Sequence, residues 1–133
     1  MTNLERHEIF EIEVLEKLKK SGLLEPLVFG GGTMLRLCHE LPRYSVDLDF
    51  WFIKTVEEDA HFSRLCQALA EHYEITDAAT KYHTLLCEIR SPHYPRRLKI
   101  EIRRELEQET RDYYNRNRFT FLLDKLRFVD YAG

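Results

Sequence analysis

The chain of 133 residues has little of what membrane-spanning, secreted or zinc-binding proteins require. Its three cysteines, Cys38, Cys66 and Cys87, are widely spaced and form no zinc-binding pattern, and so few thiols suit a reducing cytoplasm. No apolar run approaches the roughly 18 residues that span a bilayer. The N-terminus carries too much charge for a signal peptide. We therefore expect a cytoplasmic protein without a membrane partner.

Repeats, low-complexity segments and linkers are also missing from the sequence. The six histidines do not cluster, which argues against a zinc site. The length and a composition of 44% hydrophobic and 32% charged residues are typical of a soluble globular protein with one core. These features predict a single domain over residues 1–133.

Charge is distributed unevenly along the chain, although the net charge is only −3. Residues 1–89 contain 9 Lys or Arg against 16 Asp or Glu, whereas residues 90–127 contain 11 against 6. A basic C-terminal part suggests an anionic partner. The alternative is a solvated face in which these arginines pair with nearby glutamates. The sequence leaves both interpretations open.

Hydrophobic periodicity predicts an α/β fold in which helices flank a mixed β-sheet. Apolar residues at three- and four-residue steps indicate helices, and alternating or wholly apolar runs indicate strands. We expect helices at 4–20, 33–41, 57–72 and 108–130, and strands at 26–30, 46–53, 83–90 and 98–103.

Two aspartates in the segment VDLDFWFI, Asp47 and Asp49, carry the first chemical signal. Residues i and i+2 of a strand share one face, so the two carboxylates point the same way while Leu48 and Phe50 face the core. Without a cation they would repel each other and raise their pKa values. The alternative is a pair of solvated aspartates on an edge strand, but the apolar residues that follow favour a central strand.

A third carboxylate, Glu101, occurs in the alternating segment LKIEIR. Lys99, Glu101 and Arg103 take one face of this expected strand. If the strand lies beside the aspartates, three oxygen-donor groups with open positions match what Mg²⁺ or Mn²⁺ requires. The alternative is a surface glutamate paired with Lys99 or Arg103.

A glycine-rich stretch precedes the aspartates and contains Gly31, Gly32 and Thr33. A strand that leads through glycines into a helix allows backbone N–H groups to approach a triphosphate, and the helix N-terminus favours the negative charge. Thr33 could cap that helix or donate a hydrogen bond to a phosphate. The stretch is neither G-x-G-x-x-G nor a Walker motif.

Taken together, Gly31-Gly32-Thr33, LPRYS, DLDF and LKIEI resemble the polymerase-β-like nucleotidyltransferase superfamily. The segment resembles most the AbiEii/AbiGii toxin family of type IV toxin–antitoxin systems. The resemblance implies a nucleotidyltransferase core in which the glycine turn holds the NTP triphosphate. It also implies that Asp47 and Asp49 bind divalent metal, with Glu101 as the third carboxylate.

Three further residues fall on positions of the family pattern. Arg43 and Ser45 match its Arg-x-Ser-x-Asp-x-Asp run, where Arg43 either holds a phosphate or braces the turn. Lys125, in FLLDKLRF, matches a lysine that contacts nucleotide phosphates, although an exposed helical lysine is the alternative. Members of the family usually continue into a helical C-terminal region with a Lys/Arg-Asp-x-x-Asp motif, and this sequence contains no such motif.

The resemblance implies Mg²⁺-dependent transfer of an NMP from an NTP to a hydroxyl acceptor, with RNA such as tRNA as acceptor and an antitoxin as partner. Aromatic and basic residues interleave over 113–119, as in single-strand RNA binders, or they form an amphipathic helix. One alternative function is a degenerate module that binds nucleotide or RNA without turnover. Another is a transferase acting on a small antibiotic-type molecule. The sequence does not decide the oligomeric state.

Overall fold

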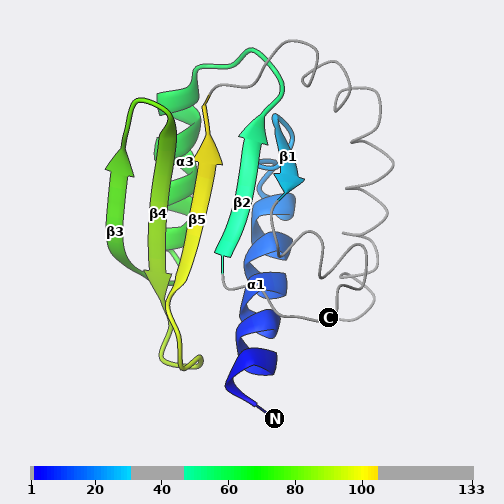
Figure 1. Cartoon of the computed structure of the whole chain (residues 1–133), viewed down its shortest axis with the longest axis vertical. Coiled ribbons are helices and arrows are strands. Elements are labelled where there is room, and N and C mark those ends of the chain that lie inside the picture. The colour runs from blue at the N-terminus through cyan, green and yellow to red at the C-terminus, as the bar shows by residue number, and fades with distance from the viewer. Residues whose placement is uncertain (1, 31–46, 105–133) are drawn as a thin grey trace.

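The computed structural model of the chain describes residues 2–30 and 47–104. These residues form a five-stranded sheet and two helices (Figure 1). In chain order the elements are α1 (Asn3–Lys20), β1 (Leu27–Gly30), β2 (Asp47–Phe52), α3 (Glu58–Ala70), β3 (Glu74–Thr80), β4 (Thr84–Arg90) and β5 (Leu98–Arg103). The helices expected at 33–41 and 108–130 lie outside the described residues.

The sheet is mixed, as the order of expected elements indicated. Its strand order is β1-β2-β5-β4-β3. Neighbouring β2 and β5 run parallel, whereas the other three neighbouring pairs are antiparallel. Strand β2 therefore has a hydrogen-bonded neighbour on each side, which confirms that the aspartate-bearing strand is not an edge strand.

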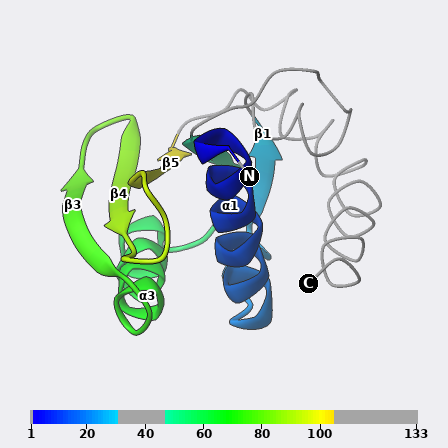
Figure 2. The same cartoon turned by 90° about the horizontal axis from the view of Figure 1, so that it is seen from below.

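Both helices pack on the same face of the sheet, which we call the inner face (Figure 2). The core fills the space between them, and apolar side chains from every layer are fully buried there. Examples are Phe10 of α1, Leu65 of α3, Phe50 of β2 and Ile100 of β5, each 0% exposed. The opposite side of the sheet is called the outer face below.

Helix α1 has well-defined ends. The Thr2 hydroxyl accepts a 3.1 Å hydrogen bond from the Glu5 backbone N–H, so it caps the first turn. The helix ends at Lys20, and Gly22 follows two residues later with a φ of 76°, in the left-handed region that glycine adopts without strain. The Leu23 N–H then returns to the Leu18 carbonyl at 3.0 Å, which is the Schellman pattern. Neither helix of the described segments is long and apolar enough to cross a membrane.

Strand β3 is absent from the sequence-based expectation, which was wrong at this position. Its segment EITDAAT contains small and charged residues, and most of its side chains are exposed or half-buried. Within residues 2–30 and 47–104, the strand lies at the sheet edge and pairs only with β4, and it contains a register shift between Ile75 and Asp77. An edge strand with little buried surface lacks the apolar alternation on which the expectation depended.

Candidate active site on the outer face of the sheet

Strand β2 presents its aspartates on the outer face. Leu48, Phe50 and Phe52 are each 0% exposed on the inner face. The alternate residues Asp47 and Asp49 are half-buried and point to the other side. The alternation predicted from the sequence is therefore observed, and buried phenylalanines hold the aspartate-bearing strand in place.

The parallel pairing of β2 with β5 brings Glu101 next to the aspartates. Asp49 is directly opposite Glu101, and Asp47 is opposite Lys99. Neighbouring strands lie about 4.8 Å apart, so side chains of one row on one face come within reach of each other. The fold thus joins two carboxylate-bearing segments that are about fifty residues apart in the chain.

The surroundings of Asp49 disfavour its charged form. Burial, followed by the nearby carboxylates of Glu101 and Asp47, raises the pKa of Asp49 to about 6. The Arg103 guanidinium acts in the opposite direction, and a hydrogen bond with the Glu101 side chain adds to the upward shift of this pKa. The carboxylates are therefore arranged at a free-energy cost that a positively charged ligand would relieve.

The donor set fits a hard divalent cation in its chemistry. Carboxylate oxygens are the ligands that Mg²⁺ takes, usually one or two of them together with substrate phosphates. Within residues 2–30 and 47–104, however, no three His, Cys, Asp or Glu side chains converge tightly enough to enclose a metal ion. Asp49 and Glu101 lie opposite each other on β2 and β5, and a cation between them would relieve the repulsion that acts on Asp49.

The predicted triphosphate turn begins next to this pair. Strand β1 ends at Gly30, which is directly opposite Asp49 in the antiparallel pairing of β1 with β2. The six expected nucleotide-contacting residues lie outside the described residues, namely Gly31, Gly32, Thr33, Arg43, Ser45 and Lys125. Their roles stay predictions that follow from the resemblance.

The outer face also contains Trp51, to which sequence reasoning assigned no role. Trp51 follows Asp49 on the same face and lies opposite Arg103 of β5. The Arg103 guanidinium carbon lies 5.6 Å from the centre of the Trp51 ring, a cation–π contact. Trp51 was counted as part of an apolar run in the sequence analysis, and its position was therefore missed. The alternation of side chains along a strand places Trp51 on the same face as Asp49.

The buried His61 and the two described cysteines lie in or against the core. Burial lowers the pKa of His61, and its Nε2 lies 2.8 Å from the Leu23 carbonyl oxygen. Cys87 is 0% exposed in the core, and Cys66 packs against the core, with both thiols free. A hollow of about 480 Å³ beside His61 and Arg64 lies between α3 and the end of α1, on the inner side of the sheet and away from the carboxylates.

Comparison with known proteins gives a consistent result. The family described as "Nucleotidyl transferase AbiEii toxin, Type IV TA system" matches residues 13–123. Comparison with curated protein sequences finds no significant match.

Two crystal structures from Helicobacter pylori have a similar fold. One is described as a candidate nucleotidyltransferase, with a TM-score of 0.51 and 22% identity over 77% of this chain. The other, JHP933, has a TM-score of 0.52 and 20% identity over 82% of this chain. The matches cover 46% and 48% of those two proteins, so the chain spans about half of their length.

Proposed function

The chain belongs to the AbiEii nucleotidyl transferase toxin family, and on this premise we propose that it transfers an NMP group from an NTP to a hydroxyl acceptor in a Mg²⁺-dependent reaction. The observation that carries the proposal is the pairing of Asp49 with Glu101 on the outer face, beside the end of β1. The carboxylates of Glu101 and Asp47 disfavour the charged form of Asp49, which is a free-energy cost that a bound cation would offset.

In this proposal, Asp47, Asp49 and Glu101 hold Mg²⁺ or Mn²⁺. A divalent cation bound there supplies charge neutralisation at the α-phosphate and lowers the pKa of the attacking hydroxyl. The parallel strands fix the carboxylates before substrate binds, so that little reorganisation is needed during the reaction. Backbone N–H groups of the glycine turn hold the β- and γ-phosphates.

The transfer itself is a substitution at the α-phosphorus. The acceptor oxygen forms a bond to this atom, the bond to the bridging oxygen breaks, and pyrophosphate leaves with the electron pair. The hydroxyl proton passes to water. Positioning the acceptor in line with the leaving group supplies much of the rate enhancement in such reactions.

The acceptor, the biological role and the partner are inferred from the family. We infer an RNA acceptor such as tRNA, a toxin role and a cognate antitoxin as partner, which the words of the family description suggest. A small-molecule acceptor is the competing possibility. Competition of the labelling reaction by bulk tRNA, but not by small hydroxyl compounds, would favour RNA.

The direct test is transfer of label from each α-labelled NTP to bulk RNA by the purified chain with Mg²⁺. We expect product with the natural chain, and none with Asp47→Asn or Glu101→Gln. Asp77→Asn is the matched control, because this exposed carboxylate lies on β3 of the same sheet, away from β2. Product formation by Asp47→Asn would contradict the site, and lack of product with the natural chain would contradict the activity.

A further inference from the structure

The hairpin that joins β4 to β5 is strongly basic. Between Glu88 and Glu101 the chain contains three arginines and one lysine but no Asp or Glu. The side chains of Arg90 and Arg97 are 56% and 57% exposed. This local excess of positive charge contrasts with the acidic character of residues 1–89.

The basic residues continue from the carboxylate site along the outer face. Lys99 is directly opposite Asp47 in the pairing of β5 with β2. Arg97 precedes Lys99 by two residues, so it follows on the same face about 7 Å further along. Arg90 follows Glu88 in the same way on β4, and Glu88 is opposite Lys99. The hairpin thus lies at the end of the sheet where β2 begins (Figure 1).

A hollow of about 360 Å³ lies at this hairpin. Two arginines border it, together with one serine and one tyrosine. Its lining consists of Arg90, Ser91, Pro92, Tyr94, Pro95 and Arg97. Guanidinium groups bind phosphate oxygens in a bidentate manner, so two of them beside one hollow suit a phosphodiester group.

Helix α1 holds the hairpin in a fixed position. The Tyr94 ring stacks on Phe10 with a centroid distance of 4.5 Å, and its hydroxyl donates to Glu13 at 3.2 Å. The Arg6 guanidinium donates to the His93 carbonyl oxygen at 2.7 Å. A basic loop that is already ordered loses less conformational entropy when it binds a ligand.

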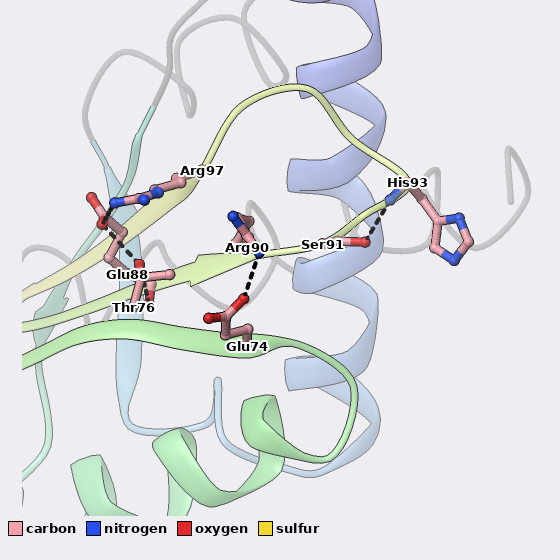
Figure 3. A network of polar contacts seen from close by, with 7 residues as sticks. All are labelled: Glu74, Thr76, Glu88, Arg90, Ser91, His93 and Arg97. Atoms are coloured by element: carbon pink, nitrogen blue, oxygen red, sulfur yellow. Dashed lines mark hydrogen bonds and ion pairs between the residues drawn. The ribbon is translucent and has the colours of Figure 1, made fainter.

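Ion pairs within the sheet do not account for this basic segment. Arg90 pairs with Glu74 at 3.0 Å and Arg97 pairs with Glu88 at 3.5 Å (Figure 3). Exposed pairs of this kind contribute about 0 to 1 kcal/mol, so a phosphate can replace the glutamates as partner.

We propose that the basic hairpin, residues 90–97, binds the phosphodiester backbone of an RNA acceptor and directs one of its hydroxyls toward Asp47 and Glu101. This proposal rests on the proposed function, because it takes RNA as the acceptor. A membrane surface is a poor alternative, since none of the exposed large hydrophobic residues of the described segments lies in the hairpin.

The test is fluorescence anisotropy of a labelled single-stranded RNA with the full chain, in the absence of NTP. We expect Arg90→Gln/Arg97→Gln to weaken binding about tenfold or more at about 100 mM salt, and to reduce the slope of log Kd against log salt by about 1.4. The matched control is Arg64→Gln, an exposed arginine of α3 on the other side of the sheet. It should change the Kd by less than about twofold.

Equal RNA affinity of the natural chain and the double variant would overturn the proposal, and so would an equal loss of affinity in Arg64→Gln. RNA binding too weak to measure in the natural chain would also overturn it. The rise in melting temperature produced by Mg²⁺ and NTP tests nucleotide binding, and therefore the proposed function, independently of RNA binding. The double variant should retain that rise. In steady-state transfer to RNA, the double variant should have a raised KM for RNA, while its kcat stays within about threefold of the natural chain.

Discussion

The two faces of the same strands differ in what they do. On β2, Phe50 is fully buried on the inner face, whereas its neighbour Asp49 is half-buried among other carboxylates on the outer face. The inner face stabilises the fold by removing apolar surface from water. The outer face holds charges that repel each other, and it lies beside the basic hairpin. A strand with alternating residues can therefore stabilise the fold with one face and present charged groups for chemistry on the other.

The largest expected effect concerns activity and the outer face. Asp49→Asn should reduce NMP transfer by about 10³-fold or more, because an amide keeps the shape but loses the charge that binds the cation. The same change should leave the melting temperature in metal-free buffer unchanged or raise it by about 1 to 4 °C, because it removes carboxylate repulsion. A clear loss of stability would mean that Asp49 is mainly structural.

Breaking the inner face should give the reverse pattern. Phe50→Ala removes a side chain that is 0% exposed and contacts Phe29 with a centroid distance of 5.3 Å. We expect the free energy of unfolding to fall by about 3 to 5 kcal/mol, measured by urea denaturation. A loss below about 1 kcal/mol would indicate that the core around β2 is loosely packed.

A substitution at the end of α1 should change the free energy of unfolding less than Phe50→Ala does. Gly22→Ala places a side chain at a φ of 76°, where nothing lies within 4 Å of the added Cβ. Backbone strain alone should therefore lower the free energy of unfolding by about 1 kcal/mol. Gly22→Asn is the matched control, since asparagine tolerates this conformation better and should cost less. Equal stability of all three proteins would contradict the Schellman assignment.

The smallest expected effect depends on pH. The pKa of His61 is lowered by burial, so the folded state favours the neutral ring, and stability is lost as the pH falls below the unfolded value of about 6.5. Between about pH 7.5 and 5.5 the natural chain should lose about 1 to 3 °C more in melting temperature than His61→Gln. Parallel curves for the two proteins would show that His61 titrates normally.

Much of this arrangement could be predicted from the sequence, because buried strands leave a strong pattern. Alternation in DLDFWF and LKIEIR placed Asp47, Asp49 and Glu101 on the correct faces of their strands. Whether the two strands are neighbours could only be assumed, since strand order depends on contacts between distant segments. The parallel register that puts Asp49 opposite Glu101 is information that the structure adds.

Other features left no such pattern. Edge strand β3 is too polar to be recognised by alternation, and Trp51 was counted with the apolar residues around it. The basic excess after residue 90 was noticed, but its two interpretations could not be separated without the fold. The structure shows that its first part, the basic hairpin, is held by α1 at the same end of the sheet as Asp47.

The most direct test of the central claim is the melting temperature of the full chain with each NTP, with and without Mg²⁺. A ligand that binds only the folded state adds stability, and about 1 to 3 kcal/mol would raise the melting temperature by a few degrees. The account predicts a Mg²⁺-dependent rise with at least one NTP that disappears in Asp49→Asn and persists in Asp77→Asn. A rise that survives in Asp49→Asn, or no rise with any NTP, would contradict it.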